Sequence, residues 1–216
     1  MSHIKPNRQY SKAEYVSDAV VHGLGIGGAL VAGPVLITLV VVWTKDVGLT
    51  TAVSIYAACL LAMWVCSALY NLVQRADLTP RLRQLDQSAI YFKIAGTYTP
   101  FVALASGSAG FLAGIWATAL GGASIILFSR KAPLWLAIVL YLGLGWAGAV
   151  LGGPLLSGIS ETALALLVIG GLLYSAGIIF LISHRLPFHN TIWHVFVLIA
   201  TVSCYAAIVT EVAQAA

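Results

Sequence analysis

Residues 19–43 read AVVHGLGIGGALVAGPVLITLVVVW, and this stretch decides the class of the protein. It holds no Asp, Glu, Lys or Arg, and it exceeds the roughly 20 apolar residues that a helix needs to cross a bilayer. A polar segment precedes it, and it lacks the small-residue cleavage site of a signal peptide. We therefore expect an uncleaved first membrane span.

Six more apolar runs of near-membrane length follow in the 216 residues. The chain is 60% hydrophobic and 8% charged, whereas an ordinary soluble domain is about 25% charged. A barrel is excluded because its strands need only about ten alternating residues. The sequence predicts an all-α membrane protein, with a cytoplasmic segment 1–18 and a seven-helix bundle 19–212. The predicted spans are residues 19–43, 49–73, 86–105, 110–128, 134–151, 161–182 and 190–212.

The positions of the eleven Lys and Arg predict how this bundle faces the membrane. Nine of them precede the first span or lie in loops of the same side: Lys5, Arg8, Lys12, Arg75, Arg81, Arg83, Arg130, Lys131 and Arg185. Only Lys45 lies in a loop of the opposite side, and Lys93 falls within the third span. Cationic loops stay in the cytoplasm, so we expect a cytoplasmic N-terminus and an external C-terminus. The net charge of +4 thus reflects topology, and we expect no nucleic-acid partner.

Polar residues within or beside the spans gather at the cytoplasmic ends. They are Glu14, Asp18, His22, Ser67, Asn71, Asp86, Asn190 and His194. Several recur every four residues, which places them on one face of a helix. Such groups are costly inside a membrane and indicate a functional site. For Glu14 and Asp18 the alternative is a helix cap or a charge that complements the helix dipole, and Ser67 can bond to its own helix.

Lys93 lies seven residues after Asp86, about 10 Å along the helix and on nearly the same face. Its side chain leans toward the helix N-terminus. We expect it to reach back toward Asp86 or to extend to the membrane interface.

Four segments resemble the hemolysin III family, the bacterial branch of the progestin and adiponectin receptor family. They are the stripe of Glu14, Asp18 and His22, then SALYN at 67–71, DQSAIYFKIAGTYTP at 86–100, and NTIWHVFV at 190–197. The resemblance covers essentially the whole chain. It implies seven helices with a cytoplasmic N-terminus, in the inner membrane of a bacterium.

The resemblance also implies a zinc ion near the cytoplasmic end of the bundle. The family's ligand positions correspond to Asn71, Asn190 and His194, while Ser67 and Asp86 correspond to residues that support the zinc-bound water. Two of the three expected imidazoles are therefore amides here, and amides are poor zinc ligands. His189 is the candidate substitute. We hypothesise that the metal site is lost or weakened and that Lys93 supplies positive charge near Asp86 in its place.

Three functions follow from these residues and from the resemblance. The first is a role in membrane-lipid homeostasis, with membrane lipids as partners. The family resemblance also implies cytolysis. The second is a zinc-dependent lipid amidase in which Asp86 and Ser67 are catalytic and His194 is a metal ligand. The third is a pore or a proton-coupled transporter. The sequence predicts no oligomeric state.

Overall fold

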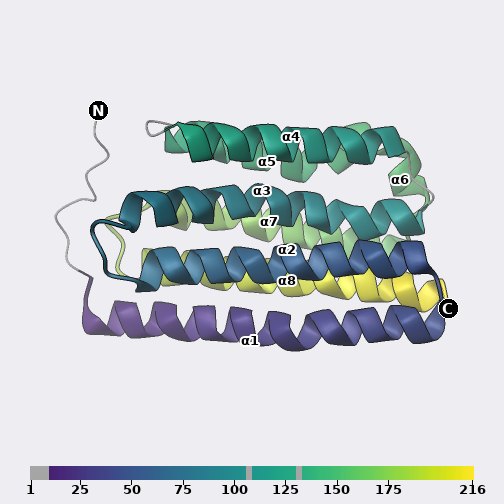
Figure 1. Cartoon of the computed structure of the whole chain (residues 1–216), viewed down its shortest axis with the longest axis horizontal. Coiled ribbons are helices and arrows are strands. Elements are labelled where there is room, and N and C mark those ends of the chain that lie inside the picture. The colour runs from purple at the N-terminus through teal and green to yellow at the C-terminus, as the bar shows by residue number, and fades with distance from the viewer. Residues whose placement is uncertain (1–9, 106–108, 130–132) are drawn as a thin grey trace.

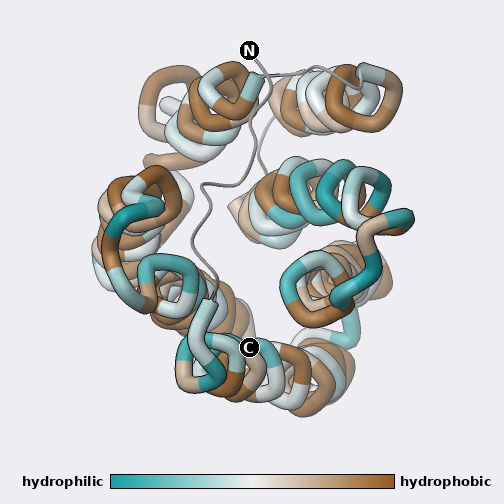
Figure 2. The backbone as a smooth tube through the Cα atoms, turned by 90° about the vertical axis from the view of Figure 1, so that its left-hand side faces the viewer, coloured by the Kyte–Doolittle hydropathy of each residue, from teal (hydrophilic) through white to brown (hydrophobic). Residues whose placement is uncertain are grey.

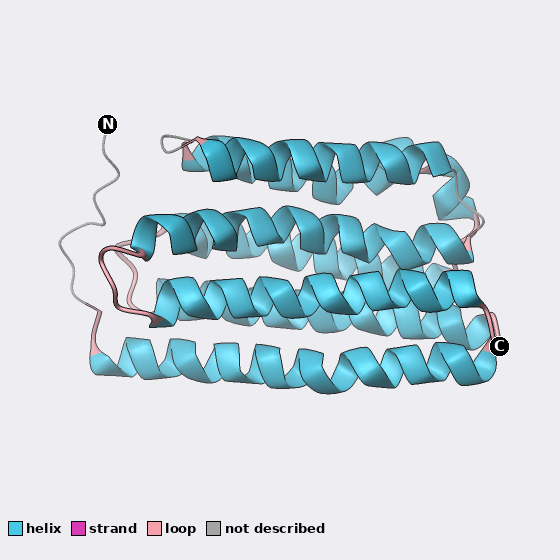
Figure 3. Cartoon of the chain, viewed as in Figure 1, coloured by secondary structure: helices cyan, strands magenta, loops and turns pink. Residues whose placement is uncertain are grey.

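The structure is a computed structural model that describes residues 10–105, 109–129 and 133–216. Within these ranges every regular element is a helix (Figures 1 and 3). The helices are α1 Lys12–Trp43, α2 Val47–Leu72, α3 Thr79–Leu104, α4 Ala109–Phe128, α5 Leu134–Leu151, α6 Gly153–Ser157, α7 Glu161–Ile182 and α8 His189–Gln214. Of the cations used to predict topology, Lys5, Arg8, Arg130 and Lys131 lie outside the described residues.

The seven long helices match the seven predicted apolar runs to within two residues at their starts, except that α1 and α3 begin seven residues earlier. Helix α1 starts at Lys12 because Ser11 and Glu14 form a capping box, in which each side chain bonds to the other residue's backbone N–H. Helix α3 starts at Thr79, with Pro80 in its first turn, where a missing N–H is tolerated. The expected loop 152–160 contains the short helix α6. Caps and proline therefore set these ends rather than the limits of apolar sequence.

The chain is an all-helical membrane protein. Among the described residues, six helices are long and apolar enough to span a bilayer: α1, α2, α4, α5, α7 and α8. Helix α3 has 26 residues, which is sufficient length, but it carries Asp86 and Lys93. Large apolar side chains such as Val31 and Leu172 point outward from the bundle, as expected for surfaces that face lipid.

The long helices run side by side along the bundle, and α1 closes it by packing against both α2 and α8 (Figures 1 and 2). Helix α3 lies against both α2 and α4, and α7 lies against α8. The start of α1, the α2–α3 loop and the α7–α8 loop lie at one end (Figure 1). The candidate site lies near that end.

Close approach of α1 to α2 depends on Gly25. A Cβ atom at Gly25 would lie 2.4 Å from the Trp64 ring. Trp64 is 1% exposed, and its ring meets the His22 ring edge-on at 5.9 Å. The missing side chain at Gly25 therefore positions an aromatic ring beside one of the candidate site residues.

Gly25→Ala should force the Trp64 ring out of place and lower the free energy of unfolding by about 1–3 kcal/mol, the usual cost of overpacking. Gly27→Ala is the matched control on the same helix, because nothing lies within 4 Å of the position that its Cβ would take. Thermal unfolding of both variants in detergent measures the difference. Equal stability of the two would contradict the packing described here.

Candidate functional site

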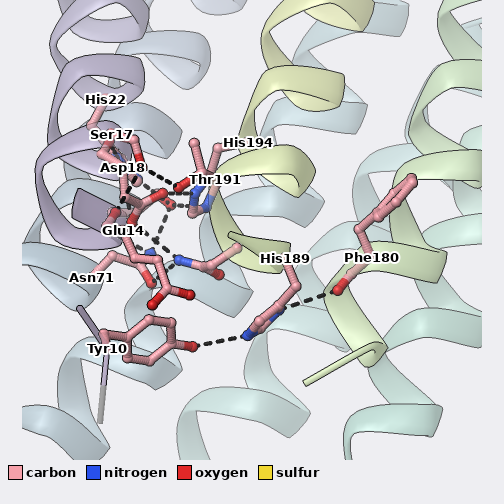
Figure 4. A network of polar contacts seen from close by, with 12 residues as sticks. Tyr10, Glu14, Ser17, Asp18, His22, Asn71, Phe180, His189, Thr191 and His194 are labelled. Carbon is pink, nitrogen blue, oxygen red and sulfur yellow. Dashed lines mark hydrogen bonds and ion pairs between the residues drawn. The ribbon is translucent and has the colours of Figure 1, made fainter. Parts of the chain in front are cut away.

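Polar residues from the first, second and last helices meet at one buried site (Figure 4). Asp18 and His22 come from α1, Ser67 and Asn71 from α2, and Asn190 and His194 from α8. The four-residue spacing seen in the sequence places each pair on the inner face of its helix. The structure thus brings together polar faces from three helices that are distant in sequence.

Asp18 is the centre of the contacts between α1 and α8. Its Oδ1 accepts a hydrogen bond from His194 Nδ1 at 2.7 Å, and its Oδ2 accepts one from Asn190 Nδ2 at 3.1 Å. Both Asp18 and His194 are buried. An ionised carboxylate at this depth needs such partners, because an unpaired buried charge is strongly destabilising.

The rings of His22 and His194 lie next to each other, with centroids 4.3 Å apart. His22 Nδ1 donates to the Asp18 backbone carbonyl at 2.8 Å. The remaining nitrogens converge on one hydroxyl: Ser67 Oγ lies 3.1 Å from His22 Nε2 and 3.3 Å from His194 Nε2.

At this point two Nε2 lone pairs face the single proton of the Ser67 hydroxyl. Each Nδ1 faces an oxygen that can only accept, so each Nδ1 carries the hydrogen, and in a neutral ring Nε2 is then a lone pair. The Ser67 hydroxyl has one proton and can donate to one ring only. A proton on the other ring, or a metal ion bound by the lone pairs, removes this conflict.

The donor set fits a zinc ion. Asp18, His22 and His194 offer ligand atoms that all lie within 4.8 Å of one another, and all three residues are buried. A carboxylate with two imidazoles is a set that zinc uses in proteins. A metal held by the two Nε2 atoms would leave Asp18 behind the rings, where its carboxylate orients His194 and its backbone carbonyl orients His22, as is usual for histidines that bind metal. Direct ligation by Asp18 would replace its hydrogen bond to His194.

The two asparagines at the expected ligand positions bond to each other. Asn190 Nδ2 donates to Asn71 Oδ1 at 3.1 Å, and Asn71 Nδ2 donates to the Ser67 carbonyl at 2.9 Å. They link α2 to α8 by a neutral bridge. The three residues that could hold a metal, Asp18, His22 and His194, therefore include a histidine of α1. The sequence spacing had placed His22 on a polar stripe with Glu14 and Asp18 but had not assigned it to a metal site.

His189 lies away from this group. Its Nε2 is 3.0 Å from Tyr10 Oη, and its Nδ1 is 3.2 Å from the Phe180 carbonyl (Figure 4). It also packs edge-on against His184. His189 therefore connects the N-terminal segment to the last turn of α7 instead of joining His194.

Glu14 has a structural position at the edge of the site. Its Oε2 accepts from the Ser11 backbone in the capping box, and its Oε1 accepts from the Phe188 backbone N–H at 2.9 Å. Phe188 has a φ of 58°, an uncommon value for a residue other than glycine. Glu14 thus stabilises both the start of α1 and the turn that leads into α8.

Asp86 lines the same cavity as Ser67 and His194, and its electrostatic neighbours include both of them and Asp18. Lys93 does not reach it. In the described ranges no hydrogen bond or ion pair joins Lys93 to Asp86, and Lys93 Nζ instead donates to Tyr174 Oη at 2.5 Å. The structure therefore does not place the positive charge of Lys93 beside Asp86, as the hypothesis of a replaced metal requires.

A cavity of about 450 Å³ opens from this polar site into the bundle. Asn71, Asp86 and His194 line its polar part, and Phe101 and Ile159 line the opposite part. The apolar lining is the larger share. Its size and character are those of a site for a small molecule or a lipid chain.

The sequence profile of the family described as Haemolysin-III related matches residues 11–205. The chain belongs to this family. It is 36% identical to the Hemolysin-3 homolog of Bacillus subtilis (strain 168) over 190 residues, which cover 86% of this chain and 88% of that protein. It is 35% identical to Hemolysin-3 of Bacillus cereus over 196 residues, or 88% and 87% of the two chains.

The similarity extends to animal proteins. The human Monocyte to macrophage differentiation factor is 28% identical over 224 residues, covering 96% of this chain and 90% of that protein. The resemblance inferred from four short segments is therefore confirmed over residues 11–205.

Proposed function

We propose that this hemolysin III protein binds a membrane lipid in its central cavity and acts in membrane-lipid homeostasis, as a multi-pass protein of the bacterial plasma membrane. The observation that carries the proposal is the cavity itself. It is apolar over most of its wall and meets buried polar groups at one end. This polarity matches an amphiphile with one chain.

The proposal includes an orientation. The start of α1, Arg81 in the first turn of α3, and Arg185 before α8 lie at the same end of the bundle, and Lys45 lies at the other (Figure 1). By the positive-inside rule the first end is cytoplasmic. The Asp18 site then lies in the cytoplasmic half, and the C-terminus is external.

Cysteine labelling in intact cells tests this orientation. In a variant without Cys59, Cys66 and Cys204, an exposed Lys45→Cys should react with a membrane-impermeant maleimide, whereas an exposed Arg81→Cys should react only after lysis. The opposite pattern would reverse the topology.

A cavity-filling substitution tests the role in lipid homeostasis. Leu167 lines the cavity, so Leu167→Trp should exclude the lipid, while Ile169→Trp on the outer face of α7 is the matched control. In cells lacking the gene, we expect altered membrane order, measured by the fluorescence anisotropy of a membrane probe. Wild type and Ile169→Trp should restore it, and Leu167→Trp should not.

Mass spectrometry of the purified protein measures directly whether the cavity holds a lipid. Wild type and Ile169→Trp should carry a bound lipid that Leu167→Trp lacks. Equal lipid content and equal rescue by both variants would contradict a role for the cavity.

Metal-dependent hydrolysis of a lipid amide is the second candidate, because Asp18, His22 and His194 form a zinc-compatible donor set. Bound zinc supplies activation of a water molecule. In this chain Asp86, which lines the cavity, is placed to accept a proton. Once both Nε2 atoms bind a metal, the Ser67 hydroxyl no longer donates to either ring and can donate toward the cavity. The apolar part of the cavity would hold the acyl chain.

Metal content and turnover test this second candidate together. Protein purified without chelator should hold about one zinc ion per chain, which His22→Ala and His194→Ala should lose. His189→Ala is the control and should keep it, because its ring faces Tyr10 and Phe180. Hydrolysis of a ceramide-like amide should stop with Asp86→Ala or a chelator. A wild-type protein without metal would remove the hydrolase and leave the lipid-binding proposal intact.

A further inference from the structure

A lysine lies deep inside the cavity, apart from the Asp18 site. Lys93 is only 4% exposed, and it lines the cavity together with Tyr174 and Cys204. It follows Asp86 by seven residues on α3, about 10 Å further along the bundle by the helical rise. The cavity therefore has two polar levels, and the deeper one contains a single basic side chain.

The partners of this lysine are neutral. Its Nζ donates to Tyr174 Oη and lies 4.2 Å from the centroid of the Tyr174 ring. Tyr174 Oη in turn lies 2.7 Å from Thr201 Oγ1 on α8. An ammonium group has three N–H donors, and a single phenolic oxygen satisfies one of them.

No protein carboxylate balances this charge. All seven acidic side chains of the sequence lie in the described part of the chain, and none of them forms an ion pair with Lys93. They are Glu14, Asp18, Asp46, Asp77, Asp86, Glu161 and Glu211. A buried cation in a membrane bundle is costly without an anion. The deeper level of the cavity is therefore suited to receive one.

We propose that Lys93 and the Tyr174 hydroxyl bind the carboxylate of a long-chain fatty acid, whose chain lies in the apolar part of the cavity. This inference rests on the proposed function in one respect, namely that the cavity takes up a lipid. It adds the chemical class of the lipid and the place of its charged end.

The charge and the size of the site both select this class. One ammonium balances one carboxylate, whereas the dianion of a phosphate monoester would leave a negative charge buried. The single charge of a phosphodiester would also be balanced, so the size of the cavity is what separates a fatty acid from a phospholipid. A neutral lipid would cover Lys93 with hydrocarbon and leave the ammonium unpaired. A cavity of about 450 Å³ lies in the lower part of the range of small-molecule sites, about 300–1,000 Å³. It suits one acyl chain better than a two-chain phospholipid.

The hydroxyl network completes the carboxylate site. Either oxygen of the Tyr174–Thr201 pair can be the donor. When Thr201 donates to Tyr174, the phenolic proton is available to the ligand. Beyond Lys93 the walls are mostly apolar, with Phe101, Leu155 and Leu164 among them, and these surfaces suit the chain.

Quenching of tryptophan fluorescence by a brominated lipid tests the proposal in the full-length protein. Trp64, Trp146 and Trp193 line the cavity and report a brominated chain. The probes are 9,10-dibromostearic acid and its methyl ester, which differ only in the charged end. Wild type should bind the acid roughly thirty-fold or more tightly than the ester, because loss of one partner of a buried charge pair has an effect of this size.

The variants locate the charge that gives this preference. Lys93→Met should abolish the preference for the acid, and Tyr174→Phe should reduce it roughly tenfold through loss of one hydrogen bond to a charged group. Lys45→Met is the matched control, because Lys45 is exposed in the loop between α1 and α2. It should behave as wild type.

Several results would overturn the proposal. Equal binding of acid and ester by wild type would show that no buried cation binds the carboxylate. This comparison uses the wild-type protein alone, so it does not depend on whether a variant folds. A preference that survives in Lys93→Met and disappears in His194→Gln would place the charged end at the Asp18 site. If neither probe quenches the wild-type protein, then the cavity takes no lipid, and the proposed function fails together with the inference.

Discussion

The hydrogen bond between Asp18 and His194 joins the first long helix to the last, and much of the bundle depends on it. A polar side chain inside a membrane must find its partner within the protein. Asp18 meets this requirement across α8, through His194 and Asn190. Ser17 and Thr191 add a hydroxyl contact of 3.0 Å between the same two helices. These contacts hold α1 against α8 at the end of the bundle where the cavity reaches its polar groups.

The packing of α1 against α8 brings two imidazole rings within hydrogen-bond distance of one serine hydroxyl. His22 comes with α1 and His194 with α8, and Ser67 on α2 lies between their Nε2 atoms. The amides of Asn71 and Asn190, which occupy positions where the family resemblance implies imidazoles, bond to each other. His22 of the first helix thus places a second imidazole beside His194.

The cavity combines this site with a second polar level around Lys93. The two levels differ in kind: the first has a carboxylate and two imidazoles, while the second has one basic group among hydroxyls. Apolar walls connect and extend them. A ligand in this space meets defined polar groups at two depths, so the arrangement favours an amphiphile over an ion that passes through the bundle.

The sequence by itself determined the class, the helices and the family. Apolar runs of membrane length act locally, because each residue contributes to transfer into a bilayer largely independently of its neighbours. The helix starts at Ser11 and Pro80 also have local causes, because capping and proline act within one turn, but a prediction from apolar runs placed both starts seven residues too late. Spacing of four residues showed that Asp18 and His22 share a face. Only the tertiary structure decided which faces meet.

The rotation of α1 brings His22 to His194, while the α7–α8 turn directs His189 to Tyr10. The packing of α7 beside α8 gives Lys93 the partner Tyr174 in place of Asp86. Periodicity fixes a direction around one helix axis, but the contacts depend on the rotation of one helix relative to another, and packing between helices sets that rotation.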